Sequence, residues 1–257
     1  MQIIYFLVAL FSTILGSSAG LGGGIIIKPV LDSLGDYALP TINLLSSSTI
    51  FIMSIVTVFY QLKKKDKINP KNTIVVATGS VVGGIIGQKL MSFILSKDIN
   101  IDLINNIQSI IIIILLISVF LYMRNKDNIK SYKINNILAI GLLGLFLGAI
   151  SAFLGIGGGP INVAAFTILF SMTANEAARN SILVIFFSQG SKIISIAVTT
   201  GFSSYNLDML PYMLVGGVLG GIIGYKINKA ASEKSIIKIF NSVTLSIILL
   251  NFYNIFK

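Results

Sequence analysis

The chain contains no cysteine and no histidine. Without cysteine it cannot form a disulfide, a thiolate nucleophile or a cysteine-ligated metal site. Without histidine it lacks the commonest transition-metal ligand and the usual proton shuttle at neutral pH. Acidic side chains are also scarce, with nine Asp and Glu among 257 residues. Since no nucleophile, set of metal ligands or pair of carboxylates converges within the apolar segments, we expect no enzymatic activity, no metal site and no cofactor.

Charge of either sign is low for a chain of this length. Charged residues make up 11% of the sequence, whereas a soluble domain carries about a quarter. Hydrophobic residues make up 54%, and the mean hydropathy is +0.90. Several apolar runs, for example the one around residues 107–123, reach the length of about 18 residues that marks a membrane-spanning helix. The composition therefore predicts an all-α polytopic protein of the cell membrane, with lipid as a partner.

The net charge of +10 comes from lysines that cluster in short connections such as KKKDK at 63–67. Lysines in short loops set the orientation of membrane helices, because such loops stay in the cytoplasm. This interpretation explains the charge without nucleic acid, which we do not expect as a partner.

One glycine-rich stretch occurs twice, as GLGGGIII at 20–27 and as GIGGGPIN at 155–162, which begins 135 positions later (155 minus 20). Three consecutive glycines weaken a helix and leave backbone amides and carbonyls unpaired. In hydrocarbon such a break is tolerated only where the backbone is buried in protein or lines a wet cavity. The pair is therefore the predicted functional centre.

The chain divides into ten apolar segments. Eight are long enough to cross a bilayer, and the two that directly follow the glycine runs suit half-helices. The predicted segments are 3–19, 25–35, 41–61, 72–95, 104–123, 134–154, 160–172, 174–200, 208–228 and 235–256.

A second repeat supports a division into halves. VGGIIGQK at 82–89 matches LGGIIGYK at 219–226, in the same order and at an offset of 137 (219 minus 82). For these glycines we favour close helix packing through small residues over a ligand site. The predicted halves are a first transmembrane repeat, 1–123, and a second, 134–257, joined by a basic cytoplasmic linker, 124–133.

The lysines indicate that the halves have opposite orientations. The connection at 63–71 is rich in lysine, whereas its counterpart at 200–207 has no lysine or arginine. The next pair of equivalent connections shows the opposite pattern, because there the lysines lie in the second half, at 226–234. Equivalent connections with exchanged charge belong on opposite membrane faces, which predicts inverted repeats with both termini outside.

Half-helices that start beside the glycines would present free amides and the positive end of a helix dipole, which favour an anion. Hydroxyl and carboxamide groups nearby could donate hydrogen bonds, and a buried cation could balance the charge. Lys28 and Arg179 could instead extend to the membrane interface. The candidate substrate-binding residues are Gly20, Gly22, Gly23, Gly24, Ser46, Ser47, Gly155, Gly157, Gly158, Gly159, Pro160, Asn162, Arg179, Asn180, Ser181 and Lys192.

Paired Gly-x-Gly-Gly-Gly motifs, one early in each half, resemble the sulfite exporter TauE/SafE family of membrane permeases. The second motif is followed directly by Pro160, whereas the first has its proline at Pro29, and the sequence ARNS at 178–181 also resembles the family. The resemblance implies a permease for small sulfur-containing anions such as sulfite or organosulfonates. A membrane assembly or scaffolding protein without transport activity is the alternative, and tightly packed glycine runs without a polar cavity would favour it.

Overall fold

The computed structural model describes residues 1–64, 70–97 and 101–256. These residues form ten α-helices and one short 3-10 helix, with no strand among them, as the all-α prediction requires. The helices are α1 (Gln2–Ala19), α2 (Gly24–Leu34), α3 (Leu39–Lys63), α4 (Pro70–Leu95), α5 (Ile101–Arg124), η1 (Lys126–Asn128), α6 (Ile137–Leu154), α7 (Gly159–Phe170), α8 (Ala174–Thr199), α9 (Leu210–Ala230) and α10 (Glu233–Phe256).

Eight of these helices are long and apolar enough to cross a membrane, which confirms the predicted number within the described residues. The other two, α2 and α7, have only 11 and 12 residues. At a rise of about 1.5 Å per residue they reach little more than halfway through a hydrocarbon core of about 30 Å. Both begin at the third glycine of a Gly-Gly-Gly run, as half-helices should.

The helix breaks depend on glycine conformation. In each break the backbone has positive φ at three glycines, at 75°, 81° and 78° in the first copy and at 69°, 77° and 72° in the second. Side chains other than glycine rarely adopt this conformation. Pro160 occupies the first turn of α7, where its missing N–H would have no helical partner in any case.

Glycines also set the closest helix contacts. A Cβ atom at Gly83 would collide with the carbonyl oxygen of Leu145, so α4 lies directly against the backbone of α6. A Cβ atom at Gly224 would lie 2.5 Å from the carbonyl oxygen of Ile14, and this brings α9 against α1 in the same way. Close packing through small residues, the interpretation favoured for the second repeat, is therefore confirmed.

The helix contacts repeat when the halves are exchanged. The contact between α4 and α6 corresponds to that between α9 and α1, and the contact between α3 and α9 corresponds to that between α8 and α4. The pairs α2–α3 and α7–α8 correspond as well, and α3 contacts α8 across the two halves. This pairing is what a pseudo-twofold arrangement would produce; the inverted orientation itself stays a prediction.

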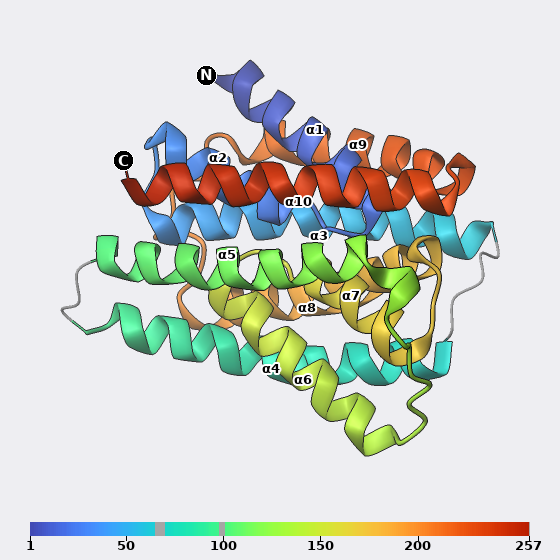
Figure 1. Ribbon diagram of the computed structural model, residues 1–257. Helices are drawn as coiled ribbons and strands as arrows, with labels where there is room; N and C mark the ends of the chain where they lie inside the picture. Colours follow the sequence, from blue (N-terminus) through green and yellow to red (C-terminus); the bar gives the residue numbers. More distant parts are fainter. Residues whose placement is uncertain (65–69, 98–100, 257) are drawn as a thin grey trace.

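Figure 1 shows how the ends of the helices are distributed. Both termini and the connection between α8 and α9 lie toward the left, and α1 runs from there into the middle of the molecule. The ends of α3, α5 and α9, which lead into the three predicted basic connections, lie toward the right, where α6 also begins. Helices α1 and α6, which lead into the two glycine runs, therefore begin toward opposite sides of the molecule in this view. Residues 65–69 of one basic connection lie outside the described residues.

Candidate functional site

The two glycine breaks meet in the core. We call residues 20–23 loop 1 and residues 155–158 loop 2. A Cβ atom on Gly159 would collide with the carbonyl group of Leu21, and one on Gly24 would lie 3.2 Å from the carbonyl oxygen of Ile156. All residues of both loops are buried. The breaks are therefore in direct backbone contact.

Helices α3 and α8 flank the loops in an equivalent way. A Cβ atom on Gly155 would meet the side chain of Asn43 in α3, and one on Gly20 would meet Ala178, the residue 135 positions after Asn43, in α8. Ile50 and its counterpart Ile185 also face the loops, at Gly157 and Gly22. One face of each helix therefore lines the junction of the two loops.

Ser181 connects the two breaks. Its hydroxyl group lies 2.8 Å from the carbonyl oxygen of Gly20 and 3.4 Å from that of Gly159, and donates to both. Ser46 is its counterpart in α3, and its hydroxyl oxygen has no hydrogen-bond partner among the described residues. The same is true of the hydroxyl oxygen of the neighbouring Ser47, and both side chains are fully buried.

Further unpartnered polar atoms lie beside loop 2. A Cβ atom on Gly158 would lie 2.9 Å from the hydroxyl oxygen of Ser151 and 3.5 Å from the carboxamide oxygen of Asn162. Neither oxygen has a hydrogen-bond partner in the part of the chain that the structure describes, and the same holds for the carboxamide oxygen of Asn43. An unsatisfied buried polar group costs about 1–3 kcal/mol. Such groups, gathered at one junction, are what a binding site for a polar solute requires.

Two buried lysines come from helices that meet the loops, Lys28 from α2 and Lys192 from α8. The Lys28 side chain donates to Gln108 Oε1 at 2.6 Å and to the carbonyl oxygen of Leu154 at 3.0 Å. No hydrogen bond or ion pair joins Lys192 to another described residue, and its side chain is only 2% exposed. The side-chain nitrogen of Gln189 lies 3.9 Å from the Cβ position of Gly157, and Lys192 follows Gln189 by three residues, so it lies on the same face of α8 one turn further along.

Two other candidates have protein partners. Thr73 donates to the carboxamide oxygen of Asn180, whose amide group donates to the carbonyl oxygen of Glu176 at 2.7 Å. Arg179 is half-buried and donates through Nε to the carboxamide oxygen of Asn228, 3.1 Å away. These contacts direct Asn180 toward α4 and Arg179 toward α9. Their assignment as substrate ligands stays a prediction.

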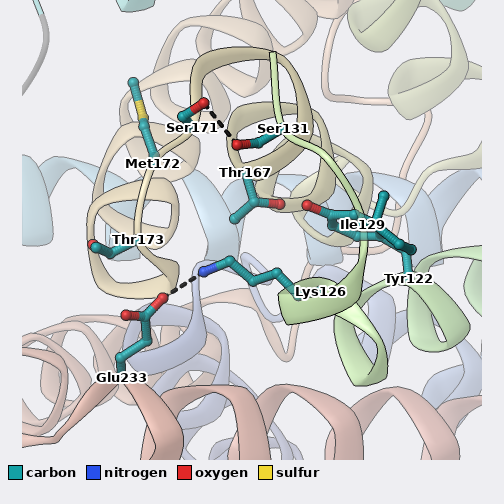
Figure 2. Close-up of a pocket in the computed structure, with 9 residues that line it drawn as sticks. All are labelled: Tyr122, Lys126, Ile129, Ser131, Thr167, Ser171, Met172, Thr173 and Glu233. Carbon is teal, nitrogen blue, oxygen red and sulfur yellow. Dashed lines mark hydrogen bonds and ion pairs between the residues drawn. The ribbon is translucent and has the colours of Figure 1, made fainter. Parts of the chain in front are cut away.

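Figure 2 shows a separate pocket of about 200 Å³ at the predicted cytoplasmic end. It lies between the connection after α5 and the turn from α7 to α8, where Ser171 donates to Ser131 at 2.8 Å and Lys126 forms an ion pair with Glu233. Its lining residues are Tyr122, Lys126, Ile129, Ser131, Thr167, Ser171, Met172, Thr173 and Glu233. None of the candidate substrate-binding residues lines it, so it is distinct from the glycine junction.

Several polar groups near the loops are not among the residues predicted from the sequence, namely Asn43, Ser151, Gln108, Gln189 and Asn228. Each lies within an apolar segment. Because polar side chains at membrane depth are costly, this position could have marked each of them as a functional candidate. Their position in the sequence alone does not indicate which of them face the loops.

Comparison with known proteins places the chain among membrane transporters. The family model for the sulfite exporter TauE/SafE matches residues 5–251. The probable membrane transporter protein YunE of Bacillus subtilis (strain 168) is 24% identical over 268 residues, covering 95% of each chain. The probable membrane transporter protein MJ0441 of Methanocaldococcus jannaschii is 26% identical over 247 residues, covering 90% of this chain and 87% of that protein. No solved structure gives a significant match.

Proposed function

The chain belongs to the sulfite exporter TauE/SafE family and is a membrane transporter; from this premise we propose that it carries small sulfur-containing oxyanions, such as sulfite or organosulfonates, across the cell membrane. The proposed binding site is the junction of loops 1 and 2. Its proposed ligands are the first amides of α2 and α7, the hydroxyl groups of Ser46 and Ser47, and the ammonium group of Lys192.

The observation that carries this proposal is the convergence of two half-helix starts with unpartnered buried polar groups. Both α2 and α7 begin at the loops, so their first amides and the positive ends of their dipoles are directed at the junction. A helix start of this kind favours an anion. The free hydroxyl groups on α3 add donors of the type that an oxyanion accepts.

The charge of the core points to the same class of substrate. Lys192 has no ion pair with an acidic side chain among the described residues, so its positive charge is available to a bound anion. An isolated charge in a membrane interior is expensive and marks a functional site by default. A metal or organic cation would be repelled by the same group.

Transport would use the two halves as moving parts. The exchangeable helix contacts support two related repeats, and binding sites between inverted repeats at broken helices are a recurring transporter arrangement. We propose that α1–α2 and α6–α7 enter from opposite membrane faces, with both termini outside, and that they expose the junction to each face in turn.

A structural scaffold is the second candidate, because the loops are in direct backbone contact. Against it stand the unpartnered oxygens beside the loops and the unpaired charge of Lys192, which destabilise a purely structural core. The polar groups therefore favour transport.

The test is solute flux in proteoliposomes that contain the purified chain. We expect saturable movement of sulfite or sulfoacetate and none of a cation such as choline. The Gly158→Leu variant is expected to show no flux, because a side chain there would come within 2.9 Å of Ser151 at the proposed site. Absence of flux for every sulfur oxyanion in wild-type liposomes, or equal flux through Gly158→Leu, would reject the proposal.

A further inference from the structure

The helix ends that precede the two loops share one unusual contact. A helix leaves its last four carbonyl groups without partners, and in a membrane core each such group costs several kcal/mol. In α6 the carbonyl oxygen of Phe153 accepts a 2.7 Å hydrogen bond from the side-chain amide of Gln108. In α1 the carbonyl oxygen of Ser18 accepts a 2.8 Å hydrogen bond from the side-chain amide of Asn228.

The two carbonyl groups occupy equivalent positions. Phe153 comes 135 residues after Ser18 (153 minus 18), the same offset that separates the glycine runs. Each lies two residues before its loop. The donors are not equivalent in sequence, because Gln108 comes from α5 and Asn228 from α9. The two helix ends are therefore held by the same kind of contact, although the donors come from different positions in the two halves. Duplication of one sequence motif would not by itself produce this pair.

Each of the two carboxamides also accepts a hydrogen bond from a cationic side chain. Lys28 donates to the carboxamide oxygen of Gln108, and Arg179 donates to that of Asn228. This fixes which end of each carboxamide is turned toward the helix. Each cation also lies near a helix carboxyl end, where positive charge is favourable. Lys28 extends this role by donating directly to the carbonyl oxygen of Leu154, the last residue of α6.

We infer that Gln108 and Asn228 are a matched pair of positioning residues, each of which, oriented by Lys28 or Arg179, holds the carboxyl end of an interrupted helix and so fixes the glycine loop that follows. This inference rests on the proposed function in taking the loop junction as the transport site. It assigns Lys28 and Arg179 to the support of the loops instead of direct contact with the solute.

Two substitutions distinguish a positioning role of the carboxamides from one in which they only neutralise the neighbouring cation. Gln108→Glu keeps an oxygen for Lys28 but, ionised beside that cation, cannot donate to Phe153. Asn228→Asp does the same for Arg179 and Ser18. If the carboxamides only neutralise the cations, the acidic variants should equal or exceed the wild type. If they position the loops, the acidic variants should resemble Gln108→Leu and Asn228→Leu.

The experiment is amide hydrogen exchange of the full chain in lipid nanodiscs, which needs no substrate. We expect Gln108→Glu and Gln108→Leu to accelerate exchange about tenfold at loop 2 and not at loop 1, the factor expected for one buried hydrogen bond. Asn228→Asp and Asn228→Leu should show the reverse pattern. The matched control is Asn251→Leu, which removes a buried carboxamide of α10 whose bond stays within its own helix.

Exchange at loop 2 that is unchanged in Gln108→Glu, or that rises equally at both loops, would overturn the inference. Sulfite flux in proteoliposomes serves as the second measurement, and the acidic variants should raise the KM for sulfite. If the wild type moves no sulfite while the loop-specific exchange pattern is observed, the proposed function fails and the positioning role stands.

Discussion

The hydroxyl group of Ser181 donates a 2.8 Å hydrogen bond to the carbonyl oxygen of Gly20, which lies 161 positions earlier in the chain. Gly20 ends α1 with a left-handed backbone, so its carbonyl oxygen has no place in the regular helix ladder. The contact ties the end of a helix in the first half to α8 in the second. The hydroxyl group of Ser46, the counterpart of Ser181, has no hydrogen-bond partner among the described residues, so it is free where that of Ser181 is bonded.

This asymmetry predicts different results for two chemically identical substitutions. Ser181→Ala should lower the stability by about 1–2 kcal/mol, because the Gly20 carbonyl oxygen loses its partner in a buried site. Ser46→Ala removes a hydroxyl group that has no partner within the described residues, so the stability should be unchanged or higher, while the KM for sulfite should rise. Thermal unfolding in nanodiscs and proteoliposome flux measure the two effects. Equal loss of stability in both variants would contradict the asymmetry.

A second prediction concerns the contact between the loops. Gly159→Ala should destabilise the protein by about 2–3 kcal/mol and reduce flux, because its Cβ atom would collide with the carbonyl group of Leu21 and force the loops apart. Gly35→Ala is the matched control. Gly35 has a positive φ of 75° but nothing within 4 Å of its Cβ position, so that variant should lose only about 1 kcal/mol and keep its flux.

If Gly159→Ala instead behaves like Gly35→Ala in thermal unfolding and in flux, the loops are free to separate at little cost. Direct backbone contact would then not be what holds the junction together.

The helices and their breaks follow from the sequence because their signals are local. Apolar length distinguishes the eight spanning helices from α2 and α7, and glycine triplets mark the breaks whatever the surroundings. The close packing of α4 on α6 was also predictable, since glycines such as Gly83 recur at four-residue spacing.

The partners of the polar side chains were not predictable, because they depend on which helices become neighbours. Asn180 adjoins Ser181 in sequence, but neighbours in a helix point about 100° apart, and Asn180 bonds Thr73 in α4 while Ser181 reaches the loops. The contact of Arg179 with Asn228 joins residues 49 positions apart. No spacing rule connects such pairs without knowledge of the fold.

Lys192 provides a third prediction. Lys192→Met keeps most of the apolar side chain and removes a buried charge that has no ion pair among the described residues. The folded protein should therefore be at least as stable, while the KM for sulfite should rise about tenfold through loss of one charge-assisted hydrogen bond. Lys192→Arg, which keeps the charge, is the control. An unchanged KM in Lys192→Met would return this lysine to a structural role.

The orientation of the halves is tested by cysteine labelling, for which the absence of native cysteine gives a clean background. Ser204 lies in the connection between α8 and α9, and Lys64 caps the end of α3; both are exposed. These two segments lie at opposite ends of the molecule in Figure 1. Single Ser204→Cys and Lys64→Cys variants therefore place one reactive thiol on each predicted membrane face.

An impermeant maleimide should label Ser204→Cys in intact cells and Lys64→Cys only in inside-out vesicles, since lysine-rich connections stay in the cytoplasm. A permeant maleimide controls for the reactivity of both thiols. Labelling of both variants from the same side would mean that the two ends of the molecule do not face opposite compartments. The α1–α2 and α6–α7 hairpins would then not enter from opposite membrane faces, and the junction could not be opened to each face in turn by the mechanism proposed.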